Sequence, residues 1–225
     1  MCGRFTLYSD KKEIEQHFHV SFTDDVPYEP GYNIAPGSIQ PVILTKGTRD
    51  RVVEPLVWGY IPSFAKDKQA QSPLINARSE TIHEKPSFRQ SFQRRRCIIP
   101  SNGFFEWKEV GSKKVPFYIR LLEEPLFGMA GIFDTYTNDR GKELTTFAIL
   151  TTSANDLIEP LHHRMPVLLR PSDYDVWLDP VTKEQDRLPA LFKPHPTPGM
   201  SLYRVNEEVN NPSNNTPDLI QPKLK

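Results

Sequence analysis

The sequence is poor in the residues that build disulfide-rich, zinc-binding or membrane proteins. Its 225 residues include only two cysteines, Cys2 and Cys97, which are too few for a disulfide framework or a structural zinc site. No apolar run approaches the roughly 20 residues that span a bilayer, and the N-terminal MCGRFTLYSD lacks the apolar segment of a signal peptide. We therefore expect a cytoplasmic protein with free thiols, no membrane association and no metal.

The chain also has no excess of charge of either sign, since 28 Lys and Arg balance 28 Asp and Glu. Any surface for nucleic acid must therefore be a local arrangement of arginines rather than a global field. The sequence contains no Walker loop, no dinucleotide-binding glycine fingerprint, no H-E-x-x-H and no C-x-x-C. These absences argue against NTPase, dehydrogenase and zinc chemistry, and we expect no cofactor.

Hydrophobic patterning predicts many strands and few long helices. Asp10 and Glu13 have capping-box spacing, which predicts a first helix from Asp10. Short helical pieces broken at Pro86 are expected over 76–96, a short helix over 156–161, and another over 172–178 with Ser172 as its cap. A turn at 46–47 and a hairpin loop at 134–141 are also expected. The β-like segments are 41–45, 51–58, 97–99, 104–108, 115–121, 127–133, 144–152, 167–170 and 202–205.

Because no regular βαβ alternation appears, these segments predict an α+β fold. We expect a single domain with a curled, mainly antiparallel, barrel-like sheet and short flanking helices, over residues 2–209. A polar C-terminal tail, poorly packed at its end, is expected over 210–225. The basic run 94–96 is interpreted as a solvated helix end.

Cys2 has the most distinctive chemistry in the chain. Methionine aminopeptidases act when the second residue is small, so Cys2 is expected to become the N-terminus once Met1 is removed. It then carries an amine with a pKa of about 8 beside a thiol, and this 1,2-aminothiol condenses with an aldehyde to a five-membered thiazolidine. On the first three residues alone, the favoured interpretation of Cys2 is a small, buried hydrophobic side chain.

Seven short motifs, four of which are difficult to explain by packing alone (32–37, 76–81, 103–107 and 162–166), together resemble the signature of the SOS-response-associated peptidase family, the abasic-site processing proteins. The resemblance runs from Cys2 to about Val209. The motifs are MCGRF (1–5), YNIAPG (32–37), WGYIP (58–62), NARSET (76–81), RCIIP (96–100), GFFEW (103–107) and HHRMP (162–166).

The resemblance implies that Cys2 covalently captures the aldehyde of an abasic site. Asn76 would orient the amine or the aldehyde oxygen, and Glu106 would supply a proton. His162 would shuttle protons near the sugar; by sequence alone His163 is its rival, and the family pattern selects His162.

The environment of Glu106 can be interpreted in two ways. Its aromatic neighbours Phe105 and Trp107 would raise the pKa of the carboxyl and favour its protonated form. Strand alternation, however, places Glu106 on the same face as Phe104 and Lys108, which would be compatible with a solvated carboxylate.

Further residues match the family's DNA-binding positions. Arg4, Arg78 and Arg164 would bind phosphates on either side of the lesion, and Trp58, Phe64 and Trp107 would stack on bases. Strand aromatics are more often part of a core, and Phe64 departs from the pattern because many members carry Trp there. Cys97 lies in an expected core strand and is interpreted as structural.

The implied function is that of a DNA-damage response protein that binds abasic sites in single-stranded DNA. It would form a thiazolidine crosslink through Cys2 and shield the site from strand cleavage, with crosslink reversal and thiol autoprotease activity as further activities. Such a protein would be a monomer, associated with the nucleoid in a bacterial cell. Two alternatives remain open: an N-terminal-nucleophile amidohydrolase of the glutaminase type, because Met-Cys-Gly also opens such domains, and a non-catalytic DNA-binding module.

Overall fold

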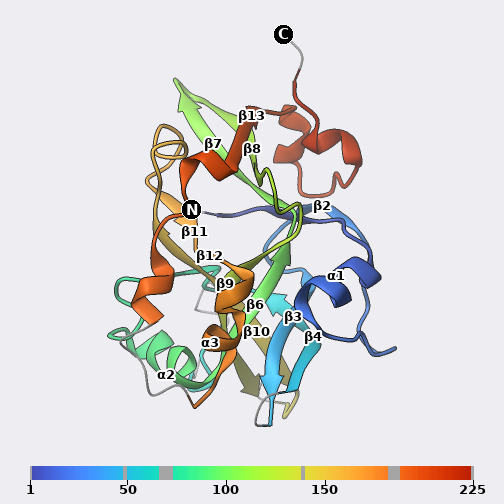
Figure 1. Cartoon of the computed structure of the whole chain (residues 1–225), viewed down its shortest axis with the longest axis vertical. Coiled ribbons are helices and arrows are strands. Elements are labelled where there is room, and N and C mark those ends of the chain that lie inside the picture. The colour runs from blue at the N-terminus through green and yellow to red at the C-terminus, as the bar shows by residue number, and fades with distance from the viewer. Residues whose placement is uncertain (1, 48–49, 66–72, 138–139, 182–187, 224–225) are drawn as a thin grey trace.

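Two curved sheets organise the chain (Figure 1). The computed structural model describes residues 2–47, 50–65, 73–137, 140–181 and 188–223. The smaller sheet has the strand order β13-β8-β7-β1-β2. Its strands are β1 (Phe5–Leu7), β2 (Gly31–Ile34), β7 (Gly103–Val110), β8 (Lys113–Leu121) and β13 (Met200–Arg204).

The larger sheet closes on itself, because one of its strands, β10, pairs with both β4 and β9. The closed ring runs β10-β4-β3-β6-β9. Pairing is antiparallel except where β10 meets β4 and β5, so the expected α+β fold with a barrel-like, mainly antiparallel sheet is confirmed. The strands are β3 (Ile39–Lys46), β4 (Asp50–Trp58), β5 (Asn76–Arg78), β6 (Arg96–Ser101), β9 (Phe127–Thr137), β10 (Glu143–Ser153), β11 (Arg164–Pro166) and β12 (Leu168–Leu169).

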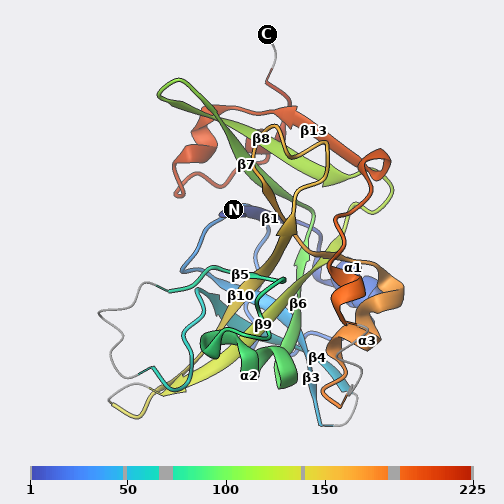
Figure 2. The same cartoon turned by 90° about the vertical axis from the view of Figure 1, so that its left-hand side faces the viewer.

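Short helices flank the barrel: α1 (Lys11–Phe18), α2 (Pro86–Arg94) and α3 (Tyr174–Leu178). Helix α1 has the predicted capping box between Asp10 and Glu13. Helices α1 and α3 lie together on one side of the barrel (Figure 2), where Phe18 stacks on Tyr174. Short 3-10 helices cover Pro171–Asp173, Leu188–Phe192, Thr197–Gly199, Glu207–Asn210 and Pro217–Ile220.

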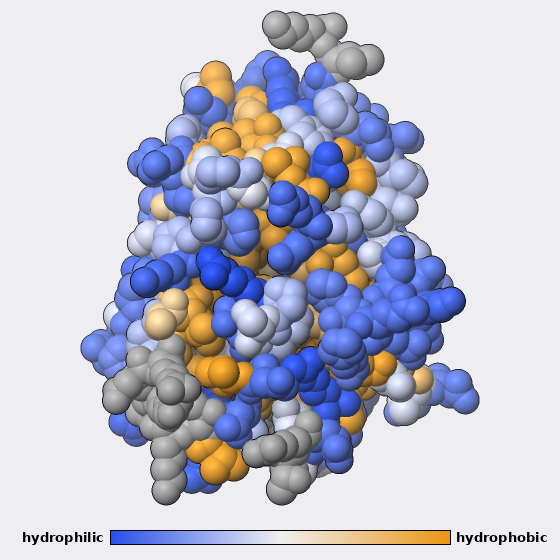
Figure 3. Space-filling view, viewed as in Figure 1, coloured by the Kyte–Doolittle hydropathy of each residue, from blue (hydrophilic) through white to orange (hydrophobic). Residues whose placement is uncertain are grey.

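Two apolar clusters hold the sheets together. The larger fills the barrel and its flanks, with Ile43, Ile98 and Phe147 among its fully buried members. The smaller lies against the β7–β8–β13 sheet and includes Val209 and Leu219 from the end of the chain. Within the expected tail over 210–225, Leu219 is thus buried in this cluster, whereas residues 221–223 are exposed. Figure 3 shows apolar surface, mixed with polar groups, in the same upper part of the molecule.

Several local predictions are wrong for identifiable reasons. Residues 76–78 form β5 because their backbone pairs with β10, and Pro86 begins α2 instead of breaking a helix. Residues 156–161 form hydrogen-bonded turns, with the Asn155 side chain accepting from the Ile158 N–H. Ser172 lies inside a 3-10 turn and caps no helix. The expected loop at 134–141 falls partly outside the described residues, and β9 continues through Thr137.

The basic run 94–96 is also not a uniformly solvated helix end. Only Arg94 is exposed, while Arg95 forms an ion pair with the buried carboxylate of Asp134. The Arg96 guanidinium is buried and donates to four backbone carbonyls: Phe92, Gln93, Trp177 and Asp179. Arg96 therefore fastens α2 and α3 to the barrel.

Candidate functional site

The N-terminal segment lies against the ends of strands from both sheets. Strand β1 pairs with β7 (Phe5 opposite Phe104), and the Phe105 N–H donates to the Arg4 carbonyl at 3.0 Å. These pairings bring Cys2 close to the strand that carries Glu106. From the larger sheet, Asn76 Nδ2 donates to the Cys2 carbonyl at 3.0 Å.

Cys2 is buried and Asn76 is partly buried. The Cys2 side chain is fully buried and its Sγ lies 3.8 Å from the Arg4 carbonyl. Burial raises the pKa of the Cys2 thiol far above its ordinary value, and the negative charge of Glu106 raises it further. The thiol is therefore protonated at neutral pH. Among the described residues, Asn76 Oδ1 is buried and finds no hydrogen-bond partner, so this oxygen can accept from an incoming N–H or O–H group.

Glu106 is only 3% exposed, so the interpretation of a solvated carboxylate is wrong. The residues before it on β7, Phe104 and Phe105, are both fully buried. Burial raises the pKa of the Glu106 carboxyl above its ordinary value, because a charged carboxylate is poorly solvated there. A larger fraction of Glu106 is therefore available as a proton donor near neutral pH.

His162 is fixed by its backbone and by its ring. Its N–H donates to the Ile158 carbonyl at 3.0 Å, and its Nδ1 accepts from the Arg164 N–H at 2.9 Å. A neutral ring that accepts at Nδ1 must carry its proton on Nε2. Burial lowers the pKa of His162, which favours this neutral form. The ring of His163 stacks on it at 4.4 Å between centroids.

Strand β10 connects His162 to Asn76. The end of β10 pairs with β5 on one side, where Ile149 lies opposite Asn76, and with β11 on the other, where Ser153 lies opposite Arg164. Asn76 thus contacts the Cys2 backbone directly, and the Glu106 carboxylate lies close enough to Cys2 to raise the pKa of its thiol. His162 precedes Arg164 by two residues, so the pairing of β11 with β10 brings it to the same end of β10 as Asn76.

The three predicted phosphate-binding arginines have different environments. Arg78 is exposed at the end of β5. Arg4 is half-buried, and its Nη1 donates to Asn33 Oδ1 at 2.7 Å and to the Val209 carbonyl at 2.9 Å. Arg164 is only 7% exposed and forms a two-point ion pair with Glu80, at 2.6 and 2.8 Å. Only Arg78 thus presents its guanidinium openly to solvent.

The predicted stacking aromatics differ in the same way. Trp58 is fully buried, with its ring 5.1 Å from that of Phe5 and its Nε1 donating to the Ile75 carbonyl. It offers no ring face to a base in this structure, because it belongs to the core. Trp107 is partly buried and donates from Nε1 to Asn210 Oδ1 at 2.7 Å. Phe64 is 58% exposed.

Two residues inside the motifs were given no role by the sequence interpretation. Glu80 pairs with Arg164, and Asn33 donates from Nδ2 to the carbonyls of Val209, Asn211 and Asn214. Their presence in the NARSET and YNIAPG motifs was the available signal. Their partners lie about 80 to 180 residues away along the chain, so the sequence alone could not identify them.

The described part of the chain contains no group of three or more His, Cys, Asp or Glu residues arranged to hold a metal ion. Within the same residues, no helix is both long enough and apolar enough to span a bilayer. Cys97 is fully buried in β6, as expected of a structural residue.

Comparison with known proteins gives a consistent family. The family model described as SOS response associated peptidase (SRAP) matches residues 1–212. Abasic site processing protein YoqW of Bacillus subtilis is 41% identical over 223 residues, which cover 98% of this chain and 99% of YoqW. Abasic site processing protein YedK of Escherichia coli is 33% identical over 228 residues, covering 99% and 100%.

Solved structures agree with the sequence comparison. A crystal structure of a protein from Bacteroides thetaiotaomicron superposes with a TM-score of 0.89 at 30% identity, covering 99% of this chain and all of the other. The family model spans more than half of the chain, and the relatives are matched over nearly their whole length. The chain belongs to the SOS response associated peptidase family.

Proposed function

We propose that this protein captures abasic sites in single-stranded DNA by forming a covalent crosslink through Cys2 after Met1 is removed. One observation carries the proposal: the Cys2 backbone is held by Asn76, and the buried carboxyl of Glu106 lies close enough to raise the pKa of the Cys2 thiol. The names of the relatives, abasic site processing proteins, support the same substrate.

The proposed reaction consumes an aldehyde and an aminothiol and releases water. The neutral Cys2 amine attacks C1′ of the ring-opened deoxyribose and forms a carbinolamine. Loss of water gives an imine, and the Cys2 sulfur then adds to the imine carbon as its proton leaves. The product is a thiazolidine with C–N and C–S bonds to the same sugar carbon. The amine is essential to this ring, so Met1 must be removed first.

Glu106 is assigned the proton transfers. Ring opening and dehydration of the carbinolamine each need a proton on a departing oxygen, and a carboxyl with a raised pKa can supply it near neutral pH. The carboxylate that remains can then accept the proton of the thiol when the ring closes. Because the Cys2 thiol is protonated at rest, this order uses the amine first and the thiol second.

Asn76 is assigned to orient the Cys2 amine, and His162 is assigned to bind the opened sugar. Asn76 Nδ2 already holds the Cys2 carbonyl, so its free Oδ1 is placed to accept a hydrogen bond from the amine of the same residue. The Nε2–H of neutral His162 can donate to the hydroxyl of the opened sugar. In this scheme Arg78 is the main phosphate contact, since its side chain is exposed, and Arg4 is the second.

The test is a denaturing gel of the purified protein with a single-stranded oligonucleotide that contains one abasic site. Intact mass is measured first to establish that Met1 is absent. We expect a heat-stable shifted band with the wild type and with Cys97→Ala, and none with Cys2→Ser. A processed wild-type protein that gives no band would overturn the proposal. Glutaminase activity in the absence of DNA would favour the amidohydrolase. Equal DNA binding by the wild type and Cys2→Ser, with no band from either protein, would favour a non-catalytic module.

A further inference from the structure

The segment that follows β4 ends in a tight turn with an aromatic side chain at its tip. The Ala65 N–H donates to the Pro62 carbonyl at 3.0 Å, so Ser63 and Phe64 are the two central residues of the turn. The Phe64 ring is 58% exposed. The turn therefore presents a flat apolar face to solvent.

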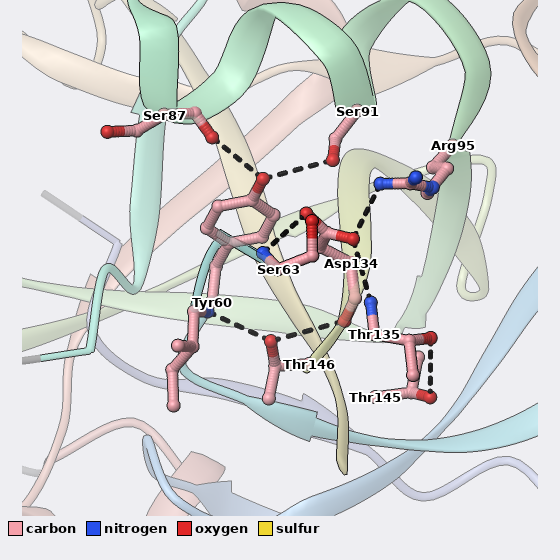
Figure 4. A network of polar contacts seen from close by, with 10 residues as sticks. Tyr60, Ser63, Ser87, Ser91, Arg95, Asp134, Thr135, Thr145 and Thr146 are labelled. Atoms are coloured by element: carbon pink, nitrogen blue, oxygen red, sulfur yellow. Dashed lines mark hydrogen bonds and ion pairs between the residues drawn. The ribbon is translucent and has the colours of Figure 1, made fainter. Parts of the chain in front are cut away.

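A buried carboxylate holds this turn from beneath. Asp134 on β9 is only 3% exposed. Its Oδ2 accepts from the Ser63 N–H at 2.9 Å, and its Oδ1 accepts from Arg95 Nη1 at 2.5 Å and from the Thr135 N–H at 2.9 Å (Figure 4). The two oxygens thus have separate tasks, because one holds the turn and the other holds the end of α2.

The residues just before the turn are fastened to other elements. The Ile61 N–H donates to Thr146 Oγ1 on β10 at 2.9 Å. The Tyr60 hydroxyl donates to the Ser87 carbonyl on α2 at 2.7 Å and also bonds the Ser91 hydroxyl (Figure 4). Burial raises the pKa of Tyr60 to about 12, so the phenol keeps its proton. Tyr60, Ile61 and Ser63 are thus each hydrogen-bonded to a different element: α2, β10 and β9, respectively.

The turn is also connected to the Cys2 site. Tyr60 and Leu74 exchange two backbone hydrogen bonds of 3.0 Å each. Asn76, which holds the Cys2 carbonyl, follows Leu74 by two residues. The aromatic turn and Asn76 therefore lie on the two segments that this backbone bridge joins.

The Asp134–Arg95 ion pair joins a buried carboxylate to a partly exposed guanidinium. Such a pair contributes little net stability, because desolvation of the carboxylate offsets the attraction between the charges. What it does provide is a defined geometry, since each oxygen of Asp134 accepts from particular donors. The arrangement places Ser63, and with it Phe64, in one position relative to β9, β10 and α2.

We propose that Asp134 is a positioning residue for DNA binding, which holds the Pro62–Ala65 turn so that Phe64 forms a fixed stacking platform for a base of the single strand beside the lesion. The inference rests on the proposed function. Asp134 does not touch the DNA in this scheme. It acts through the Ser63 N–H, and its effect should depend on the presence of the Phe64 ring.

The decisive variant is Asp134→Asn. The amide can keep its oxygen towards Arg95 and Thr135, and its NH2 group then faces the Ser63 N–H, so only the bond to the turn is lost. The rate of crosslink formation is measured against the concentration of abasic-site oligonucleotide. Phe64→Ala should raise the half-saturating DNA concentration about fivefold or more, and Asp134→Asn about threefold. The rate at saturation should change by less than about twofold for both variants, since neither removes a group from the reaction.

The double variant Asp134→Asn/Phe64→Ala decides between positioning and general destabilisation. It should resemble Phe64→Ala alone, because a misplaced turn has no further effect once the ring is absent. Leu122→Ala, at a comparably exposed apolar residue beyond β8, should match the wild type. Additive effects, an unchanged half-saturating concentration in Asp134→Asn, or a loss only in the saturated rate would each overturn the inference.

Two precautions keep the test decisive. If thermal melting shows that Asp134→Asn is unfolded, Ser63→Pro replaces it, because proline lacks the N–H and suits the second position of a β-turn. If the wild type forms no crosslink, the proposed function fails by itself. The same double-mutant cycle is then run on equilibrium binding of an oligonucleotide with a tetrahydrofuran abasic analogue, followed by fluorescence anisotropy. Coupling between residues 134 and 64 in that assay supports the positioning role, and its absence refutes it.

Discussion

The guanidinium of Arg164 and the carboxylate of Glu80 form a two-point ion pair, with Nη1–Oε1 at 2.6 Å and Nη2–Oε2 at 2.8 Å. The pair crosses the end of β10, where Arg164 Nη2 also donates to the Thr151 carbonyl at 2.6 Å. The backbone N–H of Arg164 meanwhile holds the His162 ring. One residue thus connects the turn after β5, the end of β10 and the imidazole of the site.

Glu80→Gln should lower the free energy of unfolding by about 1–2 kcal/mol at pH 7, because the buried Arg164 loses its charged partner. The loss is limited because the Glu80 side chain is half-exposed, so solvent screens part of the interaction. Hydrogen bonding to Arg164 lowers the pKa of Glu80, so its contribution is present above the unfolded pKa and is lost as the pH falls through the folded one. Urea unfolding at several pH values should show the two proteins converging in acid. Glu54→Gln, at the surface pair with Lys46, is the control and should change little; a persistent gap at low pH would contradict this explanation.

The neighbouring histidines offer a matched comparison. His162→Ala should slow crosslink formation or its reversal by about a hundredfold, the usual range for loss of a general acid or base. His163→Ala should have a much smaller effect, because His163 is more exposed and its role is to stack on His162. Single-turnover rates measured at saturating DNA separate this effect from binding. Equal losses in the two variants would argue against assigning the chemistry to His162.

The pH dependence of crosslinking should report Glu106. The Cys2 amine must be neutral and the Glu106 carboxyl protonated, so the rate should follow a bell-shaped curve bounded by the two pKa values. Burial raises the pKa of Glu106, which brings its limb of the curve closer to neutrality. Glu106→Gln should be slower throughout, and its rate should rise with pH to a plateau set by the amine alone. A bell shape retained in Glu106→Gln would assign the proton transfers to another group.

The sequence predicted well those features that depend on neighbouring residues. The capping box of Asp10 and Glu13 is local, and so is the alternation that marks the long strands of the barrel. The family motifs also selected Asn76 and Glu106, which the structure places around Cys2. Local sequence patterns could not predict which distant segments pair with one another. Strand β5 is extended only because β10 lies beside it.

The same limit explains two further errors. Trp58 was expected to stack on a base, and Arg96 belongs to a basic run that was interpreted as a solvated helix end. Their side chains nevertheless serve the core, since Trp58 is fully buried and Arg96 bonds four carbonyls from two segments. Exposure is a property of the whole fold, so a motif can indicate an aromatic or a cation without showing which way it faces.

The salt dependence of DNA binding should identify the arginine that contacts phosphate. Arg78→Ala should reduce the slope of log K against log salt by about 0.7, the value for one phosphate contact on a single strand. Arg164→Gln should change the slope less, because two nitrogens of its guanidinium already bind Glu80. Anisotropy titrations of an abasic-site oligonucleotide between low and moderate salt give both slopes. A larger slope change for Arg164 than for Arg78 would show that DNA displaces Glu80.

Asn33 is expected to control the packing of the C-terminal segment. Its Nδ2 donates to the carbonyls of residues 209, 211 and 214, and its Oδ1 accepts from Arg4. Asn33→Ala should therefore lower the free energy of unfolding by about 2–4 kcal/mol, because several of these groups stay buried without a partner. Asn215→Ala removes a more exposed bond to the Tyr32 N–H and should cost less.

Hydrogen exchange tests the local part of the Asn33 prediction. Amides in 205–220 should lose protection in Asn33→Ala before those of the barrel strands do, because this segment packs on the small sheet through few side chains, chiefly Val209 and Leu219. The Arg4 guanidinium, released from Asn33, should become freer to move, and the half-saturating DNA concentration should shift in the same variant. Unchanged protection in 205–220 would mean that the apolar contacts alone hold the segment, and that Asn33 serves only to orient Arg4.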